Sequence, residues 1–229
     1  MRIFLFFFFI STLSQAQAIK LGQFDEIKVF DGIRLTIIPS DADSLMVEGK
    51  NKSFLSIKNK NGRLYIRMDL KKRLSGFNTN VALFSSNILE VIDANEGSFV
   101  SCQDVLFQPS ITLKAQEGAE IDATLDVQKV KTKTNSGGII TLKGAAVVQN
   151  HKVATGGVLE AASLASEQVE VKIKAGGRAA VNATELAEVK VSLGGSVRVH
   201  GQPKKLIKFI AVGGSIEQIS PTIENPNNE

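Results

Sequence analysis

The chain has 229 residues, of which 43% are hydrophobic and 22% are charged, and its 27 Lys and Arg against 23 Asp and Glu give a net charge of +4. This composition excludes a globally disordered chain, which would combine low hydrophobicity with high net charge. The single cysteine excludes an intramolecular disulfide framework, and the two histidines supply no zinc-binding cluster. The small positive excess does not by itself indicate a nucleic-acid partner.

Residues 1–18 have the pattern of a secretory signal peptide. Met1 and Arg2 precede the apolar run 3–10, which is too short to cross a bilayer, and Ala16-Gln17-Ala18 fits an A-x-A cleavage site. A buried N-terminal strand or an uncleaved anchor is the alternative. No later stretch approaches the ~18 consecutive apolar residues of a membrane span. We therefore expect an exported protein without a transmembrane span, in the periplasm, at the cell surface or outside the cell.

Residues 19–86 form an N-terminal β region without a clear repeat. Strand-like runs flank Asp31-Gly32 and Asn61-Gly62, and both dipeptides are typical of hairpin turns. Further strands are expected at 44–47 and 54–57, and a basic loop at 70–80. We interpret the region as irregular coils or as a cap, because the terminal strands of a solenoid need protection from edge pairing.

Residues 87–220 repeat with a period of about 19 residues. A glycine followed by a small residue recurs at positions 97, 118, 137, 156, 176, 194 and 213. Apolar residues occupy alternate positions on both sides of each glycine, which indicates a strand, a turn and a strand. A fixed period of this size indicates a solenoid. We predict an all-β fold, a right-handed parallel β-helix (β-solenoid) with ~19-residue coils, followed by a flexible tail at 221–229.

The order of these features resembles a known family. The exported start, the opening segment 24–33, the segment 61–66 and the glycine-pair coils are similar to the putative auto-transporter adhesin, head GIN domain family of secreted bacterial proteins. The resemblance covers most of residues 24–219. It implies a β-helical, adhesin-like protein, and it brings no catalytic residues with it.

The motifs of common cofactor and metal sites are missing from the sequence. There is neither a G-x-x-x-x-G-K-[ST] phosphate loop nor an H-E-x-x-H metal helix. No repeat has the second glycine and the aspartate of a calcium-binding β-roll. We therefore expect no cofactor, no metal ion and no catalytic residues.

Two reactive residue types fall at inward positions of the repeat. His151 occupies a position that holds Leu113 or Val171 in other coils, so we expect a buried or edge histidine with satisfied hydrogen bonds and not a ligand. Cys102 shares its column with apolar residues, so we expect a small buried side chain with an unreactive thiol.

Three acidic residues, Asp122, Glu160 and Glu217, occupy matching outward positions. Glycoside cleavage needs two carboxyl groups held ~5–9 Å apart, and nothing in the sequence pairs these three. We interpret them as solvated surface residues. A β-helical polysaccharide lyase or hydrolase is the alternative, by analogy of fold alone.

Five consecutive coils have a lysine four residues before the repeat glycine. These are Lys114, Lys133, Lys152, Lys172 and Lys190. Inward positions on both sides predict that the lysines point outward in one row, ~4.8 Å apart at the backbone. The row either discourages aggregation or contacts an anionic polymer, such as an acidic polysaccharide or the phosphates of lipopolysaccharide.

These observations together predict a non-enzymatic, exported protein of the cell envelope or cell surface, an adhesin-like scaffold or binding surface. The expected partner is an anionic polysaccharide or another envelope component. Nucleic acid is not expected for an exported chain with so few aromatic residues. A periplasmic lipid carrier would need an internal cavity, whereas the narrow, alanine-rich repeat indicates a filled core. The sequence leaves the oligomeric state open.

Overall fold

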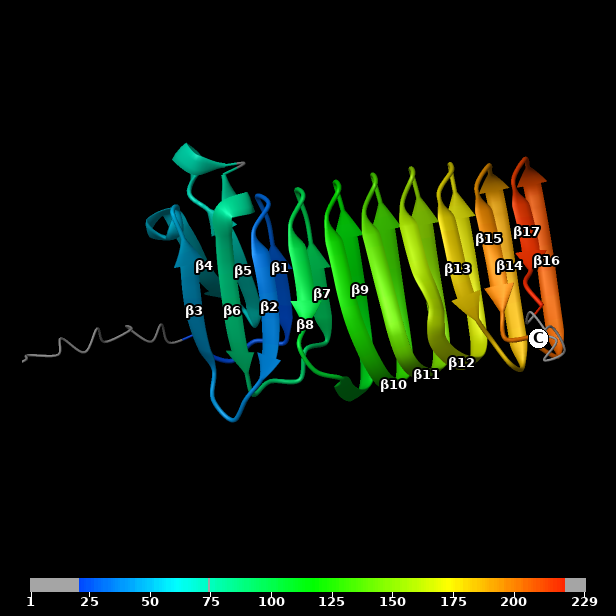
Figure 1. Cartoon of the computed structure of the whole chain (residues 1–229), viewed down its shortest axis with the longest axis horizontal. Helices are drawn as coiled ribbons and strands as arrows, with labels where there is room; N and C mark the ends of the chain where they lie inside the picture. The colour runs from blue at the N-terminus through cyan, green and yellow to red at the C-terminus, as the bar shows by residue number, and fades with distance from the viewer. Residues whose placement is uncertain (1–20, 74, 221–229) are drawn as a thin grey trace, which may run out of the picture.

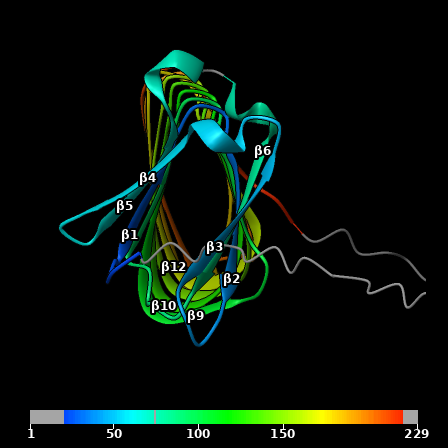
Figure 2. The same cartoon turned by 90° about the vertical axis from the view of Figure 1, so that its left-hand side faces the viewer.

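The computed structural model describes residues 21–73 and 75–220, and it confirms the predicted β-solenoid. The coils lie side by side along the long axis of the molecule (Figure 1). Seen along that axis, the stack is a flattened tube with two long walls (Figure 2). We call these two walls face A and face B.

Each face is a stack of strands, almost all of them parallel. In spatial order, face A consists of β4 (Leu55–Lys60), β5 (Arg63–Met68), β1 (Glu26–Val29), β7 (Val91–Ala94), β9 (Leu106–Gln116), the second halves of β10 (Glu120–Asn135), β11 (Ile139–Ala154) and β12 (Val158–Lys174), then β14 (Leu186–Leu193) and β16 (Lys205–Val212). Face B consists of β3 (Ser44–Gly49), β6 (Thr79–Ser85), β2 (Arg34–Pro39), β8 (Phe99–Cys102), the first halves of β10, β11 and β12, then β13 (Arg178–Asn182), β15 (Ser196–His200) and β17 (Ser215–Gln218).

The chain passes from face A to face B at the glycine corners. Two backbone requirements meet there. Gly137 has φ = 74°, in the left-handed region that glycine adopts without strain. Gly138 lies against the preceding coil, where a Cβ atom would come within 2.1 Å of the carbonyl oxygen of Ala115. The first position of the corner therefore favours glycine because of its positive φ. The second position requires a small residue because the neighbouring coil lies against it.

Apolar side chains from both faces fill the interior. One continuous cluster of buried residues extends from Leu21 to Val199. The pattern changes in the last coil, where Lys208 and Gln218 are paired with the inward residues Val189 and Val199. An inward-pointing charge on a terminal strand discourages edge-to-edge pairing.

The N-terminal coils are not stacked in the order of the sequence. β1 lies between β5 and β7, and β2 lies between β6 and β8. The predicted hairpin at Asp31-Gly32 is therefore wrong, because β1 and β2 lie on opposite faces and this dipeptide forms a glycine corner. Asp31 and Gly32 have φ = 62° and 77°, and two consecutive positive φ values suit a hairpin and a corner equally.

The hairpin predicted at Asn61-Gly62 is confirmed, since β4 pairs antiparallel with β5. β3 likewise pairs antiparallel with β6. β3 and β4 are the outermost strands at the N-terminal end, while β1 with β2 and β5 with β6 form two coils of the stack. The expected basic loop includes two short 3-10 helices, η2 (Leu70–Lys72) and η3 (Gly76–Asn78), and a third, η1 (Lys52–Phe54), precedes β4.

The signal peptide expected at 1–18 and the tail expected at 221–229 lie outside the described residues. Within the part that is described, no helix is long and apolar enough to cross a membrane.

Candidate functional site

The lysine column predicted from the sequence lies on face A. Parallel pairing places its members opposite one another, in the order Lys114, Lys133, Lys152, Lys172 and Lys190. Asp93 adjoins the column at one end and Phe209 at the other. The five side chains are exposed or half-buried, as outward positions require.

Two lysines of the column have partners within the chain. Lys172 forms an ion pair with Glu170, which lies two residues earlier on β12. This hydrogen-bonded pair raises the pKa of Lys172, and Glu188 on β14 contributes to the same shift. Lys190 Nζ lies 4.9 Å from the centre of the Phe209 ring. The positive charges of Lys172 and Lys190, at the C-terminal end of the column, are therefore already engaged by neighbouring side chains.

Two further lysines, outside the column, lie beside the remaining three. Lys129 and Lys131 precede Lys133 at alternate, exposed positions on β10. Lys114 and Lys152 flank Lys133 on β9 and β11. Over residues 21–73 and 75–220, none of these five forms an ion pair. We call these five lysines the basic patch.

Lys129 and Lys131 were not predicted from the sequence, because the lysine column compares equivalent positions in successive repeats. The signal that reveals them runs along a strand, as the alternation Lys-Val-Lys-Thr-Lys over 129–133. Alternate residues on a strand point to the same side, ~6.6 Å apart, so this row ends at Lys133, where it meets the lysine column. The five ammonium groups are therefore arranged in a T.

A groove of about 380 Å³ runs through the basic patch. It is lined by Lys131, Lys133 and Lys152, with the neutral Thr112 and Asn150 beside them and the Glu170–Lys172 pair at its C-terminal end. The lining lysines of two adjacent coils, β10 and β11, have no acidic residue beside them, and a negative charge enters the lining only at Glu170 on the next coil. This distribution suits a ligand that carries several negative charges.

A buried chain of polar groups lies beneath this groove. His151 Nδ1 lies 2.8 Å from Thr132 Oγ1, and His151 Nε2 lies 2.7 Å from Gln149 Oε1. Because the amide oxygen can only accept, Nε2 donates and Nδ1 accepts. Burial lowers the pKa of His151 to about 3, so the ring is neutral. The expectation of a buried histidine with satisfied hydrogen bonds is confirmed.

Cys102 packs against the core at the predicted inward position. Burial raises the pKa of its thiol to about 12, and the negative charge of Asp122 adds to this shift. The thiolate, which is the reactive form, is therefore disfavoured at neutral pH.

The three acids predicted at outward positions lie on face B and are not brought together. Thr141 lies between Asp122 and Glu160 in the ladder, and Glu160 faces Arg178, whose Nε atom is 3.8 Å away. Glu217 lies three ladder positions beyond Glu160, after two intervening residues. In the described ranges, no three His, Cys, Asp or Glu side chains are placed to hold a metal ion.

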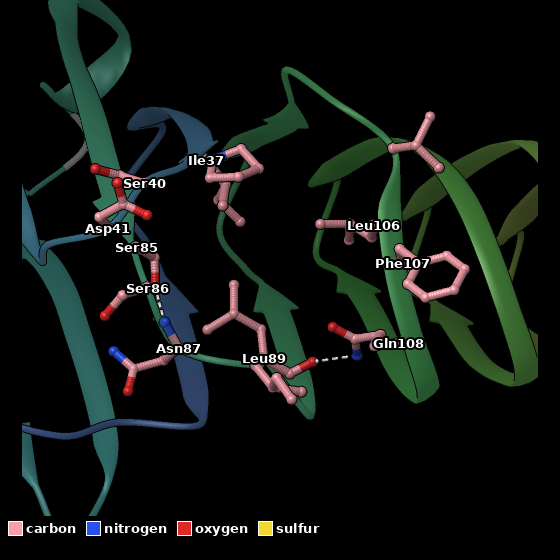
Figure 3. Close-up of a pocket in the computed structure, with 13 residues that line it drawn as sticks. Ile37, Ser40, Asp41, Ser85, Ser86, Asn87, Leu89, Leu106, Phe107 and Gln108 are labelled. Atoms are coloured by element: carbon pink, nitrogen blue, oxygen red, sulfur yellow. Dashed lines mark hydrogen bonds between the residues drawn. The ribbon is translucent and has the colours of Figure 1, made fainter.

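A second hollow lies at the edge opposite the glycine corners. This cleft, which we call the edge cleft, has a volume of about 630 Å³ and opens between the ends of β2 and β6 and the start of β9 (Figure 3). Ser40, Asp41, Ser86 and Asn87 line one wall, and Leu106 and Phe107 line the other (Figure 3). Its residues come from loops and strand ends that are far apart in the sequence, so no repeat or local motif predicts the cleft.

Comparisons with known proteins agree with this architecture. The family model described as "Putative auto-transporter adhesin, head GIN domain" matches residues 23–203. Among solved structures, a putative adhesin from Bacteroides fragilis NCTC 9343 has a TM-score of 0.80 at 21% identity, over 89% of this chain and 95% of that chain. A putative adhesin from Parabacteroides distasonis ATCC 8503 has a TM-score of 0.69 at 20% identity, over 89% and 95% of the two chains.

A third solved structure, a putative lipid binding protein from Parabacteroides distasonis ATCC 8503, has a TM-score of 0.67 at 18% identity, over 89% of this chain and 96% of that chain. At these identities the three likenesses show the fold alone. A search of the curated proteins found no match.

Proposed function

Because the chain belongs to the putative auto-transporter adhesin, head GIN domain family, we propose that it is an exported, non-enzymatic protein of the cell envelope or surface. It uses face A as an adhesin-like contact surface for anionic polymers. The observation that carries this proposal is the basic patch.

Charge supports an anionic ligand. Lys133 has a lysine opposite it on both neighbouring strands, and like charges directly opposite each other in a sheet oppose folding. An anionic partner would relieve this repulsion on binding. The two coils that follow have Glu170 and Glu188 beside their lysines, so the attraction is strongest at β9, β10 and β11.

Shape supports a polymer over a small anion. The groove is open along face A and crosses several strands, and its lysines present point charges on flexible stems. Such a surface gains affinity by many weak contacts along a chain of negative charges. Acidic polysaccharide and the phosphates of lipopolysaccharide both present this chemistry.

The reactive groups beneath the groove and on face B support a non-enzymatic role. The one imidazole beneath the groove is neutral and has both nitrogens engaged. The thiol of Cys102 has a raised pKa, and the outward acids of face B are separated. None of these groups forms the pair of carboxyl groups that glycoside hydrolysis needs.

Binding to immobilised polygalacturonate and to lipopolysaccharide vesicles tests the proposal, with neutral dextran as the control polymer. We expect the mature chain to bind the two anionic surfaces at low ionic strength, and to bind less as salt screens the charges. A variant with all five patch lysines changed to Gln should lose this binding while keeping its β-sheet circular dichroism. Equal binding by the variant, or equal binding to dextran, would contradict the proposal.

A further inference from the structure

The edge cleft exists because the stack has a gap beside β9. Residues 106–110 of β9 pair with β10 on one side only, since the pairing of β9 with β7 begins at Thr112. The segment 86–90 does not continue β7 toward this edge but runs as a loop. The cleft of about 630 Å³ occupies the space between that loop and β9 (Figure 3).

One side of the cleft presents large apolar side chains to solvent. Phe107 is 83% exposed, Ile88 is 63% exposed and Val105 is 50% exposed, and all three line the cleft. Beneath them, Leu89 and Leu106 are buried. Exposed apolar side chains gathered at a concave site mark a binding surface more often than a neutral one.

The polar side chains at the cleft are held in place by hydrogen bonds within the protein. The Asp43 carboxylate accepts hydrogen bonds from the Ser86 backbone N–H at 2.8 Å, the Ser86 hydroxyl at 3.1 Å and Asn87 Nδ2 at 2.7 Å. Gln108 Nε2 donates to the carbonyl oxygens of Leu89 and Ser110 at 2.8 and 2.6 Å. Gln108 therefore uses both of its amide N–H groups within the protein, and Asn87 uses one of its two.

Several acceptor groups of the cleft remain free for a ligand. The carboxylate of Asp41 has no ion-pair partner among the described residues, and the amide oxygens of Asn87 and Gln108 accept no hydrogen bond there. Asp126 lies beside Phe107 as its partner on β10, and adds a second negative charge near the aromatic ring. The lining includes no lysine or arginine.

This combination selects a particular ligand chemistry. Ammonium and guanidinium groups only donate hydrogen bonds, and both are attracted to the face of an aromatic ring. A neutral sugar hydroxyl would gain little from the negative charges of Asp41 and Asp126, whereas a cation is attracted by both. We propose that the edge cleft binds an organic cation, a primary ammonium or guanidinium group on an apolar stem. The stem packs along Val105 and Ile88, and the cation lies between Phe107 and Asp41.

Amide chemical shifts of the ¹⁵N-labelled mature chain provide the test, since they report where each probe binds. Hexylammonium represents a free alkylamine, and Nα-acetyl-lysine methylamide represents a lysine side chain of a partner protein. We expect both to shift the amides of residues 40–41, 86–88 and 105–108 at millimolar concentration, and the tighter of the two identifies the source. Hexanol and methyl glucoside are the neutral probes. If either shifts these amides as strongly as the cations do, or if no probe shifts them, the proposal is overturned.

Two exposed side chains make suitable variants because neither supports the core. Phe107→Leu and Asp41→Asn should each weaken hexylammonium binding about two- to fivefold, as expected for one cation–aromatic contact or one exposed ion pair. Glu120→Gln, an exposed acid on face B, is the matched control and should leave binding unchanged. Equal weakening by Glu120→Gln would mean that only the net charge of the protein matters, and would overturn the assignment to the cleft.

Discussion

Lys133 and Lys152 lie directly opposite each other in the β10–β11 ladder, and both side chains are exposed on face A. Such a pair costs a few tenths of a kcal/mol to about 1 kcal/mol of folding free energy. Lys133→Gln should therefore raise the free energy of unfolding in urea by about 0.3–1 kcal/mol at low salt, and by less at high salt.

Lys172→Gln is the matched control for this gain, because it removes the same charge from the same column but also removes the ion pair with Glu170. We expect no gain in stability from it. An equal gain from both substitutions would show that the local charge balance described here is incorrect.

The two glycines of one corner should differ in what they tolerate. Gly137→Ala places a Cβ in open space but in the left-handed region, at a cost of about 1 kcal/mol. Gly138→Ala forces a Cβ toward the Ala115 carbonyl oxygen, and such overpacking costs about 1–3 kcal/mol or more. Urea unfolding of the two variants measures this order, and a larger loss for Gly137→Ala would refute the stacking argument.

Burial of His151 should make the protein sensitive to mild acid. Its pKa is about 3 in the folded state, whereas an unfolded histidine titrates near pH 6.5. Below pH 6.5 the unfolded state binds a proton that the folded state does not, so stability falls by up to about 1.4 kcal/mol per pH unit.

His151→Val should flatten this dependence between pH 7 and 5, because Val171 occupies the same inward column without a titrating group. Thermal unfolding at several pH values provides the comparison. If the variant and the wild type lose stability equally over this range, His151 is not the titrating group.

Glu96 should have the opposite pH dependence. Its pKa is raised, first by burial and then by a hydrogen bond to Asp31, which is itself only 1% exposed. Between the ordinary pKa of a glutamate and this raised pKa, the folded state holds a proton that the unfolded state has released, and this contribution to stability is lost as the pH rises through the raised pKa.

Glu96→Gln keeps the size of the side chain and removes a negative charge beside Asp31. We expect the variant to be more stable than the wild type at neutral pH, with the difference shrinking as the pH falls below the ordinary range of a glutamate. Urea unfolding at neutral and acidic pH tests this, and a variant that is less stable at neutral pH would speak against the burial of charge at this corner.

The regular part of the fold was accessible from the sequence, because one column of glycines fixes the register of every coil after residue 87. The lysine column follows from the same register. The place of the β1–β2 coil was not accessible, since Asp31-Gly32 adopts the same two positive φ values in a hairpin and in a corner. Only the partners of β1 and β2 in space decide between them.

The site was accessible only in part. The repeat alignment found Lys133 but not Lys131, because alternation along a strand and repetition between strands are separate patterns. The ion pair at Lys172 depends on side-chain geometry that no column shows. The edge cleft depends on a break in the stack, and its walls come from segments more than 60 residues apart in the chain, such as Asp41 and Phe107.

The central claim is that an anionic polymer contacts the unpaired lysines and not the lysine column as a whole. The most direct measurement compares two double variants of that column for binding to polygalacturonate at low ionic strength. Lys133 and Lys152 both changed to Gln should weaken binding at least about tenfold, equivalent to about 1.4 kcal/mol. Lys172 and Lys190 both changed to Gln, with the same change in net charge, should have little effect. Equal weakening by the two variants would contradict the account.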